Sequence, residues 1–234
     1  MKNNKTSSDN KINSYHRVLD TDINKEPNQN ENLIIFGCGC FWGAEKCFWK
    51  LPGVVTTSVG YAGGSKINPS YYEVCSGITG HAEVVRVIWN VNQIDISDLL
   101  KMFWECHDPT QKNKQGNDTG TQYRSTIYFT NDKDKSTIEA SKKAYQKELN
   151  EKKFGLIETE IKKLDNFYKA EEYHQQYLAI EGSRQYCSAS PTKVKLGNFK
   201  GSNYKLTKEV WDNFNWEVDK CVLRSNNNPI KINN

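Results

Sequence analysis

The feature that most constrains the fold is an alternation of short apolar runs with helical stretches between residues 33 and 178. Residues 33–36 form a buried apolar run, and residues 41–51 then read as a helix that a Pro-Gly pair ends. Strands are also predicted at 54–61, 81–89, 125–129 and 157–163, a helical turn at 71–76, and helices that start at Ser97 and span Ile138 to Leu149. This order predicts an α/β (α+β) fold: a two-layer sandwich whose mixed sheet has a split βαβ, ferredoxin-like core.

Composition divides the chain into three parts. Residues 1–32 are rich in Asn and Lys and poor in apolar side chains, which predicts a disordered tail. Residues 33–187 carry the predicted elements and the candidate site residues, so we expect one catalytic domain there. Residues 188–234 show no clear periodicity, so we expect a long irregular C-terminal extension with a flexible end.

Charge and hydropathy exclude several classes of protein. The chain has 32 Lys and Arg against 28 Asp and Glu, a net charge of +4 that indicates neither a nucleic-acid nor a membrane partner. No apolar stretch approaches the ~20 residues of a membrane span, and the mean hydropathy is −0.79.

Seven cysteines, an odd number, cannot all pair within one chain. The polar N-terminus has no apolar signal segment, so we expect free thiols in a reducing, cytoplasmic compartment. The spacing of Cys and His completes no tetrahedral set, so no metal site is predicted.

Cys40 is the strongest candidate nucleophile. It follows a strand and a glycine turn and opens the helix predicted from residue 41. Unpaired N–H groups at a helix N-terminus favour a thiolate, and a lowered pKa activates a cysteine. Phe41 and Trp42 would form an apolar wall beside it. In the alternative reading, Cys38 and Cys40 are small buried side chains at a strand end.

Glu83 is the candidate acid. In a strand it shares a face with Val85 and Val87, so burial should raise its pKa and make it a proton donor. In the alternative reading it pairs with Arg86 at a strand end. Polar side chains of two turn-rich segments, Asp118, Tyr123 and Tyr71, could also point into a cleft; either tyrosine could instead pack in the core.

These residues lie in motifs that together resemble the peptide methionine sulfoxide reductase A family. In chain order the motifs read GCFWGAE (39–45), LPGV (51–54), GYAGG (60–64), NPSYYEVC (68–75), TGHAE (79–83), HDPTQ (107–111), QGND (115–118), GTQYRS (120–125) and AEEYHQQYL (170–178). The resemblance covers roughly residues 33–187.

The resemblance implies roles for the site residues. Cys40 would attack the sulfoxide sulfur, and Glu83 would protonate the oxygen with help from Tyr71 and Tyr123. Phe41 and Trp42 would hold the substrate methyl group, and Asp118 would order the polar side of the site. The substrate would be the S epimer, free or in oxidised proteins under repair.

The resemblance also implies recycling by thiols alone. The sulfenic acid on Cys40 would form a disulfide with Cys187, and thioredoxin would reduce it; no organic cofactor is implied. The Gly-rich segment that often follows in the family is absent, so Cys221 is a candidate relay thiol only. We interpret Cys38, Cys47, Cys75 and Cys106 as structural. We expect a monomer.

Two other functions fit parts of the pattern. A cysteine hydrolase would pair Cys40 with His81 or His107 as the base. A redox-sensing or binding module would form a disulfide without turning over a sulfoxide.

Overall fold

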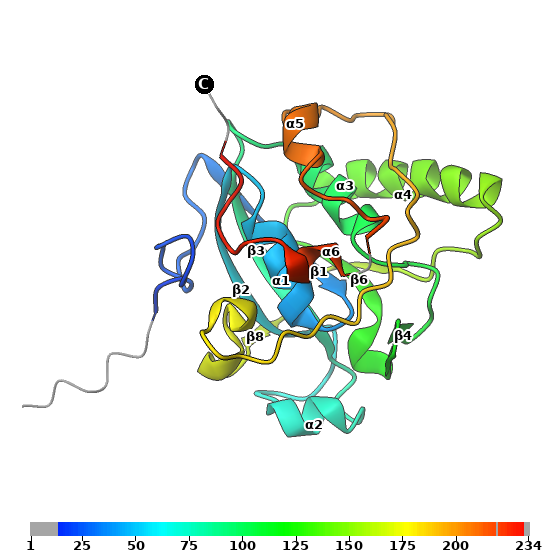
Figure 1. The fold of residues 1–234 in the computed structure, drawn as a ribbon. Helices are drawn as coiled ribbons and strands as arrows, with labels where there is room; N and C mark the ends of the chain where they lie inside the picture. The colour runs from blue at the N-terminus through cyan, green and yellow to red at the C-terminus, as the bar shows by residue number, and fades with distance from the viewer. Residues whose placement is uncertain (1–13, 219, 232–234) are drawn as a thin grey trace, which may run out of the picture.

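The computed structural model describes residues 14–218 and 220–231 and is built on one six-stranded sheet (Figure 1). The strands are β1 (Glu31–Cys38), β2 (Val54–Ala62), β3 (Ala82–Asn90), β6 (Ser125–Phe129), β7 (Glu160–Lys163) and β8 (Phe167–Lys169), with a separate pair of β4 (Lys114–Gln115) and β5 (Asp118–Thr119). The helices are α1 (Phe41–Trp49), α2 (Tyr71–Cys75), α3 (Ile96–Glu105), α4 (Asp134–Glu151), α5 (Lys208–Trp211) and α6 (Cys221–Arg224).

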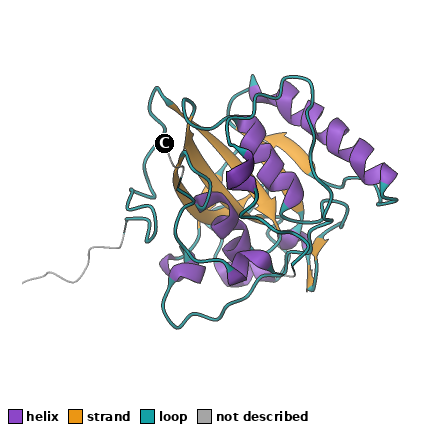
Figure 2. Ribbon diagram, turned by 45° about the horizontal axis from the view of Figure 1, so that its top comes forward, coloured by secondary structure: helices purple, strands orange, loops and turns teal. Residues whose placement is uncertain are grey.

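The sheet is mixed, in the order β7-β6-β1-β3-β2-β8. β3 lies between β1 and β2 and is antiparallel to both, whereas β7 runs parallel to β6. The connection between β6 and β7 runs through the long helix α4, as a parallel pair requires. The predicted α/β class is therefore confirmed (Figure 2).

Alternating side chains give the sheet two different faces. Phe36 of β1 points to the main core and stacks on Phe48 of α1 and Phe103 of α3, with ring centroids 4.8 and 5.2 Å apart. Its neighbour Ile35 points to the opposite face, where it joins a smaller apolar cluster that includes Tyr128. This period of two orients each strand and fixes which side chains reach α1.

The prediction that residues 1–32 form a disordered tail is wrong for residues 14–32. Residues 1–13 lie outside the part of the chain that the structure describes. His16 is buried, its Nε2 lies 2.8 Å from Thr57 Oγ1, and its ring meets Trp49 edge-on. Ile23 is buried as well, and β1 already begins at Glu31. Polar and aromatic contacts hold this segment against the rest of the protein. The prediction of disorder missed them because it rested on the small number of apolar side chains.

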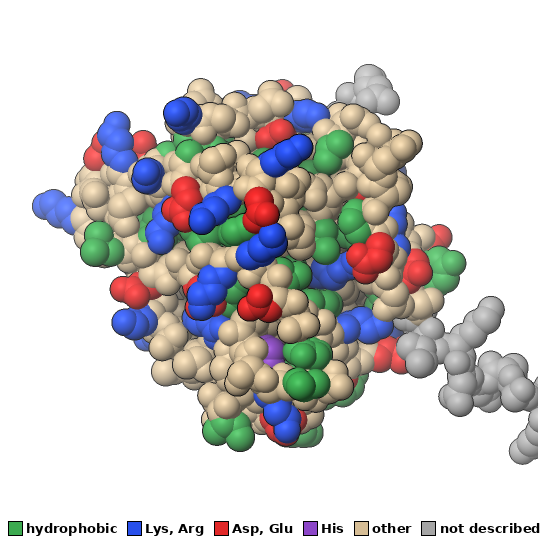
Figure 3. Space-filling view, turned by 180° about the vertical axis from the view of Figure 1, so that it is seen from behind, with side chains coloured by type: hydrophobic (Ala, Val, Ile, Leu, Met, Phe, Trp, Pro, Cys, Tyr) green, Lys and Arg blue, Asp and Glu red, His purple; other side chains and the backbone are tan. Residues whose placement is uncertain are grey.

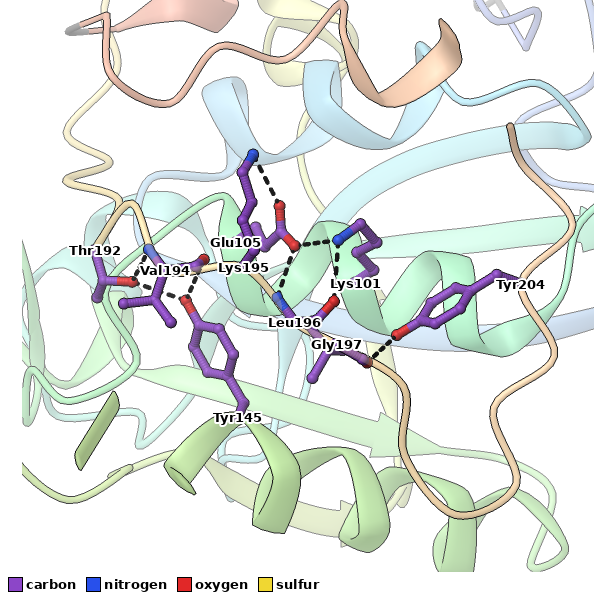
Figure 4. Close-up of polar contacts among 9 residues, drawn as sticks. All are labelled: Lys101, Glu105, Tyr145, Thr192, Val194, Lys195, Leu196, Gly197 and Tyr204. Atoms are coloured by element: carbon purple, nitrogen blue, oxygen red, sulfur yellow. Dashed lines mark hydrogen bonds and ion pairs between the residues drawn. The ribbon is translucent and has the colours of Figure 1, made fainter. Parts of the chain in front are cut away.

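The C-terminal extension forms no helix or strand between residues 180 and 207, but residues 208–211 and 221–224 within it form the short helices α5 and α6. A buried carboxylate, Glu105 of α3, holds it (Figure 4). It accepts from the Leu196 backbone N–H at 2.8 Å and pairs with Lys101 and Lys195. The irregular segment is therefore anchored by side chains from the helix layer.

The predicted flexible end is wrong for residues 222–231. Val222 is buried, and the following residues lie across α1 (Figure 1). Lys46 donates to the Ser225 carbonyl at 2.7 Å, and Trp49 donates to that of Asn227 at 2.9 Å. The asparagines contribute here through their backbone carbonyls, which composition does not reveal.

Acidic and basic side chains are interspersed on the face turned away from Figure 1 (Figure 3), in keeping with the small net charge. Within residues 14–218 and 220–231, no helix is long and apolar enough to cross a membrane.

Candidate active site

Seven residues singled out from the sequence line one cavity of about 280 Å³. They come from the start of α1, from α2, from β3 and from the segment that leads into β6. The lining residues are Cys40, Phe41, Trp42, Tyr71, Glu83, Asp118 and Tyr123, together with Arg184 and Tyr186. The sheet and two loops thus bring together side chains that lie up to 146 positions apart in the chain (186 − 40).

Cys40 is the N-cap residue of α1, and its side chain is nearly buried, with 8% exposed. Burial raises the pKa of its thiol well above the usual value, and the nearby Glu83 adds to this, while the Trp42 backbone N–H opposes it. The predicted lowering of this pKa is therefore wrong, because lost hydration outweighs the partial charge of the helix N-terminus. The thiol is held protonated.

Glu83 lies on β3 and is 2% exposed. Its Oε2 accepts a hydrogen bond from the Phe41 backbone N–H at 3.0 Å. Burial raises the pKa of Glu83 to about 8, Asp118 adds to the increase, and the Phe41 N–H opposes it. The alternating strand pattern predicted this increase. The carboxyl group is mostly protonated at neutral pH, so the cavity holds an acid beside a thiol.

Asp118 is fixed by a residue that sequence reasoning did not select. The Tyr186 hydroxyl donates to Asp118 Oδ1 at 2.5 Å, and the Arg184 guanidinium lies over the Tyr186 ring at 5.2 Å. Both residues belong to the irregular extension. The only signal for Tyr186 in the sequence was its place directly before Cys187.

The apolar wall of the cavity is held from behind. Trp42 donates from Nε1 to His174 Nδ1 at 3.1 Å and stacks on Tyr177 with centroids 3.8 Å apart. Burial lowers the pKa of His174 to about 4, so the ring is neutral and accepts this bond. Phe41 packs on the same imidazole at 5.1 Å. His174 and Tyr177 entered the sequence reading only as members of a motif.

Tyr71 and Tyr123 supply hydroxyl groups to the cavity. Tyr71 begins α2 after a Ser70 capping box, and its backbone N–H donates to Glu171 at 2.9 Å. Tyr123 ends a short 3₁₀ turn before β6. Burial raises the pKa of both tyrosines, so each remains a hydrogen-bond donor.

Cys187 and Cys221 do not line this cavity. Cys187 is buried against α1, where a Cβ added to Gly43 would come within 2.4 Å of its Sγ. Cys187 lies close enough to Cys40 to raise the pKa of the Cys40 thiol further. Cys221 begins α6 and shares a second, smaller cavity with Cys187.

A family model described as peptide methionine sulfoxide reductase matches residues 32–206. The chain belongs to this family. Among relatives of the reductase, a peptide methionine sulfoxide reductase MsrA from Salinispora tropica is 54% identical over 177 residues, 75% of this chain and 80% of the relative. A mitochondrial peptide methionine sulfoxide reductase from Bos taurus is 53% identical over 166 residues, 71% of each chain.

Solved structures of the family share the fold of this reductase. Methionine sulfoxide reductase A of Corynebacterium diphtheriae superposes with a TM-score of 0.67 at 41% identity, covering 78% of this chain and 88% of that one. Reduced Mxr1 from Saccharomyces cerevisiae gives 0.62 at 35% identity, covering 74% and 96%.

Proposed function

We propose that this reductase converts methionine S-sulfoxide, free or within oxidised proteins, to methionine through a sulfenic acid on Cys40. One observation carries the proposal: Glu83, a buried carboxyl group with its pKa raised to about 8, lines the same cavity as Cys40. An acid that is still protonated at neutral pH can neutralise the oxygen of a sulfoxide as the bond to sulfur breaks.

The attack and the proton transfer are coupled. Cys40 sulfur attacks the sulfoxide sulfur while Glu83 gives its proton to the oxygen, and hydroxyl groups of Tyr71 and Tyr123 donate hydrogen bonds to it. The proton that leaves the thiol restores the acid. The products are the thioether and Cys40 sulfenic acid, so atoms and electrons balance. Phe41 and Trp42 supply the apolar surface for the methyl group.

Recycling follows from thiol chemistry. Cys187 sulfur attacks the sulfenic sulfur of Cys40, water leaves, and a disulfide forms; Gly43 leaves room for this approach. An external dithiol, which we propose to be thioredoxin, then reduces the disulfide by exchange, with Cys221 as a candidate relay. The thiols carry both electrons, so the reaction needs no organic cofactor or metal.

We also propose the finer points of the organisation. Residues 33–187 form the catalytic domain, and the strand order β6-β1-β3-β2, with α1 between β1 and β2, supports a ferredoxin-like split βαβ core. A monomer in a reducing, cytoplasmic setting suits an enzyme whose catalytic groups come from one chain and depend on thiol reductants.

The hydrolase alternative lacks a base. His81 bonds to the Gly64 N–H through Nδ1 and lies 2.7 Å from the Lys66 carbonyl through Nε2. His107 uses its two ring nitrogens with Phe103 and Ser125. Neither imidazole lines the cavity with Cys40.

The test is turnover of a racemic peptide methionine sulfoxide with excess dithiothreitol, followed for both epimers by chiral chromatography. We expect loss of the S epimer alone in the wild type and no loss with Cys40→Ser. Thermal unfolding of both proteins provides the control for folding. Turnover that persists in Cys40→Ser, or a folded wild type that consumes neither epimer, would refute the proposal.

A further inference from the structure

A second cavity lies along α1, next to Gly43, Ala44 and Cys47, and five of the seven cysteines line it. They are Cys38, Cys47, Cys106, Cys187 and Cys221. The remaining lining is largely apolar, and the free space is about 20 Å³, which is room for one water molecule. The cavity is too small for a substrate, so its chemistry concerns the thiols themselves.

The geometry of α1 links this cavity to the active site. Cys40 and Cys47 are seven residues apart, about two helical turns, so they lie on nearly the same side of α1. Gly43 lies between them on that side, and Cys187 packs over Gly43: a Cβ there would come within 2.4 Å of the Cys187 Sγ and 3.1 Å of its Cβ. Cys187 therefore sits beside the helix between the two thiols.

Charges around the cavity act on these thiols. A Cys47 thiolate would raise the pKa of Cys187 and that of Cys221, so the three groups interact directly. A hydrogen bond with Cys106 and then burial raise the pKa of Cys47 well above its usual value, whereas Lys46 and Lys50 oppose the increase. The two cations limit this increase without reversing it, so Cys47 must lose its proton as thiol–disulfide exchange proceeds.

Cys187 can change partners more readily than the other lining thiols. It belongs to residues 180–207, which form no helix or strand. Cys38, by contrast, ends β1, and Cys106 follows α3 with its thiol directed to the Phe103 carbonyl at 3.5 Å. A change of partner on Cys187 therefore needs movement of irregular backbone and no rupture of a helix or strand.

We propose that Cys47 is a relay thiol: it takes over Cys187 from the Cys40–Cys187 disulfide and frees Cys40 before any external reductant acts. The proposal rests on the proposed function, which supplies that disulfide. Cys47 sulfur attacks Cys187 sulfur, the Cys40–Cys187 bond breaks and the Cys47–Cys187 bond forms. Cys40 takes the proton that Cys47 loses, and the number of disulfides is unchanged.

A metal site at the same cysteines is the less favoured interpretation. Ligand atoms of Cys38, Cys106 and His107 lie within 4.8 Å of one another. Both nitrogens of His107, however, are already engaged, Nδ1 with the Phe103 carbonyl at 2.7 Å and Nε2 with Ser125 Oγ at 2.8 Å.

The relay predicts how much methionine forms when no reductant is present. A chain that stops at Cys40–Cys187 releases one methionine, whereas transfer to Cys47 frees Cys40 for a second turnover. We use Cys221→Ser as the parent so that Cys221 cannot accept the disulfide. The parent should release two equivalents per chain, and the same chain with Cys47→Ser should release one.

Tryptic peptides identify the bond directly, because cleavage after Lys46 separates Cys40 from Cys47. We stop the reaction of the Cys221→Ser parent after one equivalent of methionine has formed. A disulfide should then link peptide 47–50 to peptide 185–193, and an alkylating reagent should label Cys40 as a free thiol. This measurement needs no change at Cys47, so it remains decisive if Cys47→Ser does not fold.

Cys106→Ser on the same parent is the matched control, since it alters another buried thiol of this cavity. We expect it to retain two equivalents. One equivalent from the parent, two from the Cys47→Ser chain, or one from the Cys106→Ser chain would overturn the relay. Failure of the proposed function is distinguishable, because then no chain would release even the first equivalent.

Discussion

The candidate active site depends on single side chains whose protonation is set by burial. Glu83 reaches the cavity from a strand whose alternate residues face the core, and this placement raises its pKa to about 8. The alternation of β3 made that outcome predictable from sequence. The raised pKa of Cys40 was not predictable, because it follows from burial and from Glu83, Cys187 and Asp118, which lie far from Cys40 in the sequence.

Glu83 should lower stability while serving catalysis. Its pKa is about 8 in the folded chain and 4.5 for the free side chain, so the folded state binds the proton more tightly. Stability therefore falls as pH rises from about 4.5 to about 8. Glu83→Gln, which stays neutral, should be the more stable protein at pH 8, by on the order of 4 kcal/mol, and similar to wild type below pH 4.5. Urea unfolding at both pH values measures this, and an equal difference at both would contradict it.

At the scale of elements, α1 organises the site along its whole length. Its first residue adjoins the nucleophile, Gly43 leaves room for Cys187, and Glu45 joins three parts of the chain. The Glu45 carboxylate accepts from Thr57 Oγ1 at 2.9 Å and from the backbone and side chain of Gln176 at 2.8 and 2.7 Å. It thereby positions the residues next to Tyr177, which stacks on Trp42.

Glu45→Ala should lower the free energy of unfolding substantially. Three donors would lose their acceptor in a buried site, and each unsatisfied buried group costs about 1–3 kcal/mol. Urea unfolding measures the loss, with the exposed Glu151→Ala at the end of α4 as the control. Equal stability of the two variants would show that the Glu45 contacts contribute nothing.

Gly43→Ala should slow closure of the Cys40–Cys187 disulfide. Alanine is the better helix former by about 1 kcal/mol, but its Cβ would meet Cys187 Sγ at 2.4 Å, so Cys187 must withdraw. Rapid quenching with dimedone, which reacts with sulfenic acids, should show sulfenic acid accumulating on Cys40. Disulfide closure at the wild-type rate would mean that Cys187 does not approach over Gly43.

At the scale of the whole molecule, both ends of the described chain fold back onto the catalytic core. The N-terminal segment reaches β2 and the helix layer through His16, and the C-terminal segment crosses α1 (Figure 1). Sequence periodicity located β1, β2, β3, β6 and α1 because each buries a regular face. It missed β8 and the β4–β5 pair, which have only three and two residues per strand and thus no measurable period.

Removal of residues 225–234 should destabilise the core. Lys46, Trp49 and Lys50 would lose the backbone carbonyls that they now bind. A loss of about 1–3 kcal/mol would lower Tm by about 2–4 °C per kcal/mol in a chain of this size. Differential scanning calorimetry gives the comparison, and an unchanged Tm would show that the segment adds no stability.

The most direct test of the central claim is the pH dependence of the first turnover, measured without reductant for wild type and Glu83→Gln. Glu105 is also a buried carboxyl group but lies outside the cavity, so Glu105→Gln is the matched control. We predict a wild-type rate that falls above pH 8 and a Glu83→Gln rate that is about 10²–10⁴ lower and lacks that fall. A Glu83→Gln enzyme as fast as wild type, with the same fall, would contradict the assignment of Glu83 as the acid.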